Sequence, residues 1–299
     1  MTNPTTSPTA TSAGVLPAAT RLGPTELVVR DLDRALAFYT GPLALRLHWR
    51  DDDAGRAGLG AGGEDVLVLV ADAAVRPAGR HAGLYHVAVL YPTRLELARA
   101  AARLAATRTP ISGASDHGTH EAIYLPDPDG NGLELAADRP RDAWPDFHGT
   151  IDAIRPRPLD TDDLFRLVGS GPVPEHVEPG FQTGHLHLHV GDLEAADRFY
   201  RDVIGFEPIV ELPGSAKFLA AGGYHHHVAI NVWRGEGVPP SPPDAAGLRH
   251  WTVYVPTAAD VDAVRERAAR AGTRVTERTD GILLTDPSGN AVLVARDPA

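Results

Sequence analysis

Cysteine is absent from this chain of 299 residues, so disulfide bonds, thiolate nucleophiles and zinc sites with cysteine ligands are all excluded. No apolar run approaches the roughly 20 residues that a membrane-spanning helix needs. Basic residues are outnumbered by acidic ones, 28 against 39, and the formal net charge of -11 would repel a nucleic-acid backbone. Neither a nucleic acid nor a membrane is therefore expected as a partner. Fourteen histidines remain as nitrogen ligands for a metal ion.

The first 20 residues lack charged side chains and consist mostly of Thr, Ser, Pro and Ala. A secretory signal peptide needs a basic start and a long apolar core, and this stretch has neither. Its composition predicts a disordered tail over residues 1–20. Without a targeting signal, we expect the protein in the cytoplasm.

One sequence pattern occurs twice, 161 residues apart. The stretch VVRDLDRALAFYT, from Val28, matches HVGDLEAADRFYR, from His189. In each copy an apolar strand leads to an aspartate, Asp31 or Asp192, and the apolar residues that follow recur at helical spacing. The pattern predicts a strand and then a helix capped by the aspartate.

A second pattern is also repeated. The stretch GLYHVAVLYP, from Gly83, matches GLRHWTVYVP, from Gly247, and each leads into a segment rich in Ala and Arg. Both copies end in two apolar strands around an Asp-Pro-x-Gly-Asn sequence, at residues 127–131 and 286–290. These residues favour tight turns, so each copy predicts a strand, a helix and then strands joined by a turn.

The chain is therefore predicted to be an α+β protein built from four βαβββ modules. These modules cover residues 22–71, 82–138, 183–233 and 246–296. We expect the first two modules to form a domain at residues 21–140 and the last two a domain at residues 182–299. Residues 141–181, rich in Pro and charge, are expected to connect them, with a short helix near residues 162–168. One module cannot bury its sheet face alone, so the modules should pair.

This arrangement resembles the vicinal oxygen chelate superfamily, which includes glyoxalases, bleomycin-binding proteins and extradiol dioxygenases. The resemblance covers nearly all of the chain after residue 20. It implies that paired modules curl their sheets into two cups, and that a divalent metal, when present, lies inside a cup. The fold alone does not select among the activities of the superfamily.

In that superfamily, a first-strand residue seven positions before the helix-start aspartate often binds metal. The third module has His185 there, whereas the first module has Pro24, which cannot bind. His187 and His189 share a strand face with His185, and the distance from Asp192 favours His185.

The second and fourth modules offer first-strand histidines, His86 and His250. A last-strand carboxylate is present only in the second module, as Glu134, because the fourth has Leu293 in its place. Modules one and two would lack a histidine, and modules three and four would lack the carboxylate. Modules two and three together offer His86, Glu134 and His185, the two-His-one-carboxylate set of non-haem Fe(II) oxygenases. We therefore expect these two modules to share the metal cup, and modules one and four to share a cup without metal.

Further residues are similar to the signature of extradiol dioxygenases, in particular the two-domain catechol 2,3-dioxygenases of the bacilli. His117 precedes IYLPDPDG, which contains Tyr124, and Glu134 follows shortly after. The family also has a His-His pair on a late strand, and in GGYHHHVAI the catalytic member aligns best with His226. His225 and His227 remain alternatives, because strand alternation would place them on the face opposite His226.

The resemblance implies an Fe(II)-dependent enzyme that cleaves catechol or a substituted catechol with O2, next to the diol, and yields a muconic semialdehyde. His226 is expected as acid/base, Tyr124 as a hydrogen-bond partner of the substrate oxygen and His117 as an orienting residue. Manganese is an alternative to iron, and a homo-oligomer is compatible with the sequence.

Two other functions stay open at this point. A glyoxalase-like metal-dependent isomerase or lyase would need a fourth protein ligand, an extra Glu or Gln on a late module strand, and the stretch GGYHHHVAIN has none well placed. A non-catalytic drug-binding resistance protein would need an aromatic cup without metal ligands, whereas the predicted cup gathers His and Glu.

Overall fold

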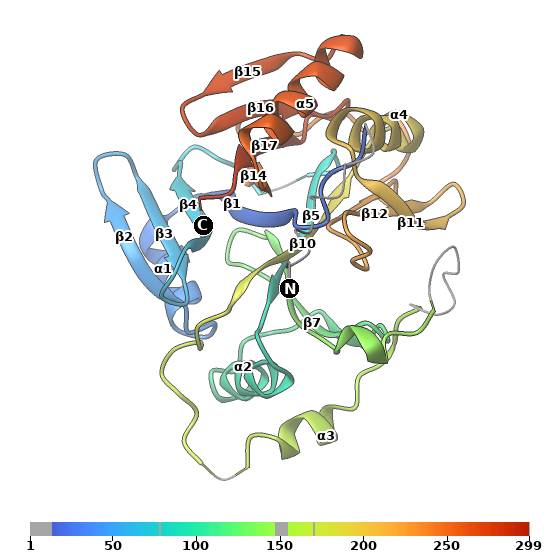
Figure 1. Cartoon of the computed structure of the whole chain (residues 1–299). Helices are drawn as coiled ribbons and strands as arrows, with labels where there is room; N and C mark the ends of the chain where they lie inside the picture. The colour runs from blue at the N-terminus through green and yellow to red at the C-terminus, as the bar shows by residue number, and fades with distance from the viewer. Residues whose placement is uncertain (1–13, 78, 147–154, 170, 299) are drawn as a thin grey trace, which may run out of the picture.

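The computed structural model describes residues 14–77, 79–146, 155–169 and 171–298. These residues form two mixed sheets, one of eight strands and one of nine (Figure 1). The order of elements repeats four times as β, α, β, β, β. The α+β class and the four βαβββ modules expected from the sequence are confirmed.

The first module comprises β1 (Arg21–Val29), α1 (Leu32–Thr40), β2 (Arg46–Asp51), β3 (Arg56–Gly60) and β4 (Asp65–Ala71). The second comprises β5 (Gly83–Leu90), α2 (Arg94–Ala106), β6 (Gly113–Asp116), β7 (His120–Pro126) and β8 (Gly132–Asp138). The connecting segment contributes a 3-10 turn (Arg141–Ala143), β9 (Arg157–Pro158) and α3 (Thr161–Arg166). The third module comprises β10 (Gln182–His189), α4 (Leu193–Arg198) with a following π-helical turn (Phe199–Ile204), β11 (Glu207–Leu212), β12 (Ala216–Ala220) and β13 (Val228–Asn231). The fourth comprises β14 (Gly247–Val255), α5 (Ala258–Arg270), β15 (Val275–Arg278), β16 (Gly281–Thr285) and β17 (Ala291–Arg296).

Polar side chains start the four module helices. The carboxylates of Asp31 and Asp192 accept hydrogen bonds from backbone N–H groups three residues later, both at 2.9 Å. Thr93 and Thr257 cap α2 and α5 in the same way. Such caps satisfy backbone donors that have no partner inside the helix, and each contributes about 1 kcal/mol.

The strand order joins modules that are not neighbours in the chain. The eight-stranded sheet runs β15-β16-β17-β14-β1-β4-β3-β2, and the nine-stranded sheet runs β11-β12-β13-β10-β5-β8-β7-β6-β9. Strands β1 and β14 therefore join modules one and four, and β5 and β10 join modules two and three. This is the arrangement that the positions of the candidate ligands required. Each sheet contains one module from residues 21–140 and one module from residues 182–299. The sheets therefore do not coincide with the two expected domains, and the division into these domains stays a prediction.

The two sheets meet near the middle of the molecule, where β1 lies against β10 and β14 against β5 (Figure 1). The two sheets and the helices share one apolar core, which includes the fully buried Trp251, Tyr39 and Tyr200. The hydroxyl of Tyr39 donates to Asp127 at 3.0 Å, and that of Tyr200 donates to Asp286 at 3.1 Å. Each bond ties the helix of one module to the tight turn of the next, and so links the two sheets.

The expected disorder of the first 20 residues does not hold for residues 14–20. Leu16 is buried in the core, and its backbone N–H donates to the carbonyl of Gly205 at 2.8 Å. The lack of charge and the small side chains of this stretch suggested disorder, but its one leucine, Leu16, packs against the third module. The rest of the predicted tail, residues 1–13, lies outside the described residues.

Candidate metal centre and active site

Three neighbouring strands bring the predicted ligands together. On β8, Glu134 lies opposite Ala88, two residues after His86 on β5. On β10, His187 lies opposite His86, so His185 follows on the same face. The Nε2 atoms of His86 and His185 lie 3.0 and 3.2 Å from the same oxygen of Glu134. One nitrogen or oxygen of each residue lies within 4.8 Å of the other two, which is close enough for a single ion.

Burial and charge set the protonation of this group. Burial alone raises the pKa of the Glu134 carboxyl, but the adjacent His185 and His86 imidazoles bring that pKa well below its usual value. Burial lowers the pKa of His185, although Glu134 opposes the shift. The carboxylate is therefore ionised and the His185 ring loses its proton readily, as metal ligands must.

Two other groups of potential ligands occur among the described residues. One consists of His185, His225 and His226, and the other of His120, Asp138 and His225. The first has no carboxylate. In the second, the oxygens of Asp138 already accept hydrogen bonds from Tyr224 and His225. The group of His86, Glu134 and His185 alone combines two imidazoles with a fully buried carboxylate at the wall of a cavity.

His117 and Tyr124 are joined across the hairpin of β6 and β7. His117 Nε2 lies 2.7 Å from the Tyr124 hydroxyl oxygen. Tyr124 is opposite Glu134 in the pairing of β7 with β8, so its ring lies on the face that carries the ligands. Burial holds the pKa of Tyr124 well above its usual value, and the side chain stays a neutral phenol.

His226 reaches the cavity beside His185, with ring centroids 4.0 Å apart. The expectation that strand alternation would separate His226 from His225 is wrong, because both rings line the cavity. Residues 221–227 form turns and bends that precede β13, and the alternation of a strand does not apply to them. His227 points into the core, where its Nδ1 accepts a hydrogen bond from the backbone N–H of Ala221.

His120 also belongs to the site, and it was not among the residues expected from the sequence. Its Nε2 lies 3.1 Å from the second oxygen of Glu134, and its ring stacks between His117 and His225, at 4.6 Å from each. One signal could have revealed it, because His120 precedes Tyr124 by four positions in one strand and therefore shares its face. It fixes the orientation of the carboxylate that faces the other two imidazoles.

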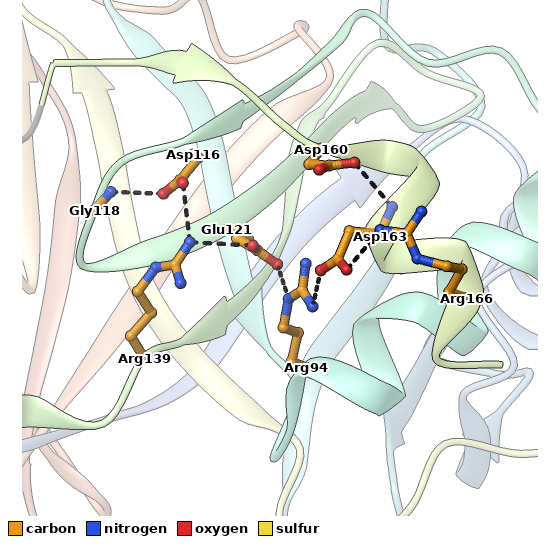
Figure 2. Close-up of polar contacts among 8 residues, drawn as sticks. All are labelled: Arg94, Asp116, Gly118, Glu121, Arg139, Asp160, Asp163 and Arg166. Atoms are coloured by element: carbon orange, nitrogen blue, oxygen red, sulfur yellow. Dashed lines mark hydrogen bonds and ion pairs between the residues drawn. The ribbon is translucent and has the colours of Figure 1, made fainter. Parts of the chain in front are cut away.

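An ion-pair network holds the hairpin that carries His117 and His120 (Figure 2). The guanidinium of Arg139 contacts Asp116 at 2.9 Å and Glu121 at 3.1 Å, the residues next to the two histidines. Glu121 is buried and also pairs with Arg94 of α2 at 2.6 Å, which in turn pairs with Asp163 of α3 at 2.7 Å. The connecting segment is thus linked to the loop of the active site through three side chains.

These residues surround a cavity of about 670 Å³, a size usual for small-molecule sites. The histidines form one wall. Tyr85, Phe218 and Trp233 form an aromatic wall, and Leu212 and Pro213 add apolar surface. A flat aromatic molecule fits the chemistry of this lining better than a strongly polar one.

The sequence model of the Glyoxalase/Bleomycin resistance protein/Dioxygenase superfamily matches residues 21–135 and 182–294. The chain belongs to this superfamily. The matched residues include all four modules, so the superfamily accounts for both sheets.

Among curated proteins, the catechol-2,3-dioxygenase of Bacillus subtilis (strain 168) is 38% identical over 279 residues, covering 92% of this chain and 96% of that protein. The biphenyl-2,3-diol 1,2-dioxygenase 3 of Rhodococcus globerulus is 31% identical over 116 residues, 37% of this chain and 60% of its own. The near full-length relationship assigns the chain to the extradiol dioxygenases of the superfamily.

Solved structures with the same fold include glyoxalase I of Zea mays, with a TM-score of 0.58 at 16% identity, covering 93% of this chain and 92% of that one. A structure from Bacillus subtilis subsp. subtilis str. 168 aligns with a TM-score of 0.66 at 15% identity, over 96% of this chain and 87% of that one. At these identities the likeness concerns the fold alone. Within the described residues, no helix is both long enough and apolar enough to cross a membrane.

Proposed function

We propose that this dioxygenase uses Fe(II) to open the ring of catechol or a substituted catechol with O2, next to the diol, giving a muconic semialdehyde. The proposal includes the cytoplasm as its location. The observation that carries it is the convergence of His86, Glu134 and His185 at the wall of a cavity suited to an aromatic ring.

The donor set fits Fe(II). It offers two imidazoles and one ionised carboxylate, and the rest of the coordination would be left to substrate and O2. The chemistry that the metal supplies when bound is chelation of a diol and electron transfer between an aromatic ring and O2. Mn(II) fits the same donors and is the alternative metal.

The other residues act on the substrate itself. His226, at the same cavity wall, accepts a proton from the diol and later returns one, and burial favours its neutral form by lowering its pKa well below the usual value. The Tyr124 phenol, oriented by His117 at 2.7 Å, donates to a substrate oxygen. The aromatic wall binds the ring face and excludes water from it.

The test is reconstitution. The purified protein is loaded with Fe(II) without oxygen, mixed with catechol and then exposed to air. A yellow ring-fission product with one O2 consumed per catechol supports the proposal. Absence of product from a range of catechols, with iron bound, would overturn it, and thioester formation from methylglyoxal and a thiol would instead indicate a glyoxalase-like activity.

A further inference from the structure

A hydrogen-bonded row of three side chains leads from β8 to the cavity. The Oδ1 atom of Asp138 lies 3.2 Å from Nε2 of His225, and Nδ1 of His225 lies 2.8 Å from Nδ1 of His226. Asp138 is four residues after Glu134 on one strand, so both carboxylates are on the same face of the sheet. His226 ends the row at the cavity.

Two neighbouring rings hold the His225 ring in place. The His225 ring stacks on His120 at 4.6 Å and lies against the tilted ring of Tyr224 at 4.0 Å. The hydroxyl of Tyr224 donates to the other oxygen of Asp138 at 2.8 Å, so both carboxylate oxygens have a partner. Turning the His225 ring over would place carbon atoms where its two nitrogens now bond.

The positions of the protons follow from this geometry. A carboxylate can only accept, so Nε2 of His225 must be the donor to Asp138. A neutral His225 then has no proton on Nδ1, and it accepts a hydrogen bond from Nδ1–H of His226. The remaining nitrogen of His226, Nε2, is left without a proton.

We propose that Asp138 is a positioning residue: acting through His225, it holds His226 in the tautomer protonated at Nδ1 and so keeps Nε2 of His226 free to accept a proton in the cavity. A neutral imidazole in water prefers its proton on Nε2, so the row selects the form that is less common in solution. The benefit to turnover rests on the proposed function, in which His226 is the acid/base. The assignment of the tautomer does not.

Among the residues that the structure describes, the eight-stranded sheet has no such row. The residue that corresponds to Asp138, four positions after Leu293, is Asp297, and it pairs with Arg21 at 2.6 Å. The registers of β4 with β1 and of β13 with β10 show that Asp65 occupies the position that His226 has in the nine-stranded sheet. The row therefore accompanies the candidate metal ligands and is not a general feature of the fold.

The tautomers can be measured directly. In long-range 1H–15N spectra of the full chain, labelled with 15N-histidine and without added metal, an unprotonated ring nitrogen resonates far from a protonated one. We expect His226 to carry its proton on Nδ1 and His225 on Nε2 at neutral pH, with signals assigned by His226→Gln and His225→Gln. A proton on Nε2 of His226, or two protons on either ring, would overturn the proposal.

Variants test the effect of Asp138. Asp138→Ala removes the acceptor, so the His226 signals should move toward a mixture of tautomers, and kcat of the iron-loaded enzyme should fall about 10- to 100-fold, a range usual for groups that orient an active residue. KM and iron content should stay unchanged. Tyr224→Phe is the matched control, because it removes the bond to the other oxygen but leaves the contact with His225.

The outcomes separate the two proposals. If Asp138→Ala keeps both the tautomer and kcat, Asp138 has no positioning role. If the unmodified protein shows the expected tautomers but does not cleave catechols, the proposed function fails and the assignment of the protons stands. Should Asp138→Ala not fold, as judged by circular dichroism, the spectra of the unmodified chain and of Tyr224→Phe still decide the tautomer.

Discussion

The two sheets of this molecule have the same architecture and different chemistry. Where the nine-stranded sheet has His185, His86 and Glu134, the eight-stranded sheet has Pro24, His250 and Leu293. In the register of β1 with β14, His250 faces Glu26, which is buried and paired with Arg56 and, at 3.6 Å, with Arg249.

The shared strand order shows that both sheets provide the same framework, and that the residues at a few positions decide whether a sheet can bind a metal ion. A carboxylate surrounded by imidazoles can hold a metal ion, whereas a carboxylate paired with guanidinium groups is neutralised and has no ligand sites to spare. Among the described residues, the eight-stranded sheet has no group of three potential ligands.

The most severe test of this comparison is to make one sheet like the other. Glu134→Leu gives the nine-stranded sheet the residue that the eight-stranded sheet has at this position. We expect bound iron to fall to background and the turnover rate to fall at least about 10³-fold, because the only carboxylate of the triad is lost. Iron content by a chelator assay and ring-fission rate are the measurements.

The reciprocal change is its matched control. Leu293→Glu adds a carboxylate two strands from Pro24, which cannot bind, so no second iron should appear. A second equivalent of tightly bound iron in Leu293→Glu, or full iron in Glu134→Leu, would show that the difference between the sheets lies elsewhere.

The second test separates ligands from the acid/base within the nine-stranded sheet. His226→Ala should retain iron and lose roughly 10²- to 10⁴-fold in kcat, the usual contribution of general acid-base catalysis. His86→Ala should lose the iron itself. If both variants keep iron, or both lose it, the roles assigned to His86 and His226 are wrong.

The third test concerns the loops. Glu121 corresponds to Asp280 of the eight-stranded sheet, which has an exposed contact with Arg278 at 3.3 Å, whereas Glu121 is buried between Arg139 and Arg94. Glu121→Gln should lower kcat about tenfold by loosening the hairpin of His117 and His120, with iron content unchanged.

Arg166→Met is the control for this network, because it removes only the outer, exposed contact with Asp163. Exposed pairs of this kind contribute about 0–1 kcal/mol, so kcat should stay the same. Equal effects of the two variants would mean that the network stabilises the fold generally and does not position the loop.

The smallest expected effect is on stability. His227 is buried where the eight-stranded sheet has Val66, and burial lowers its pKa to about 3. The unfolded chain takes up a proton below about pH 6.5 and the folded chain does not until about pH 3, so stability falls as the pH drops between these values. Between pH 7 and 5, burial of this histidine should lower the free energy of unfolding by about 2 kcal/mol. Urea unfolding should show a smaller loss over that range for His227→Val; an equal loss in both proteins would contradict the assignment.

Much of this organisation could be predicted from particular residues. The repeated Asp31 and Asp192 placed two helices, and the repeated turns placed the strand pairs that follow the other two. The absence of ligands at Pro24 and Leu293 predicted which modules pair, since only modules two and three together supply a full set. The helices and turns were predicted from signals that act over short distances in the chain, whereas the module pairing also needed the ligand positions that the resemblance to the superfamily implies.

What could not be predicted depends on how loops and separate strands meet. His225 lines the cavity because the residues before β13 leave the strand conformation. The alternation of side chains along a strand cannot predict such a departure. The network of Arg139, Glu121 and Arg94 joins segments whose approach is set by the packing of α2 and α3. Leu16 is the one leucine of a stretch of mostly small residues, and its burial against the third module depends on contacts with residues nearly 190 positions away in the chain.

The pairing of distant modules also has a consequence for the order of folding. The central strands β5 and β10 are about 100 residues apart in the chain, and β1 and β14 are more than 200 apart. Such non-local contacts are slow to form, because a long loop must be closed before any of them is made. During synthesis, β1 and β5 are complete long before their partner strands β14 and β10, and until then one edge of each strand has no hydrogen-bonded partner. The residues proposed to bind iron are therefore brought together by a late step of folding, and a chain that stops before β10 has no metal centre at all.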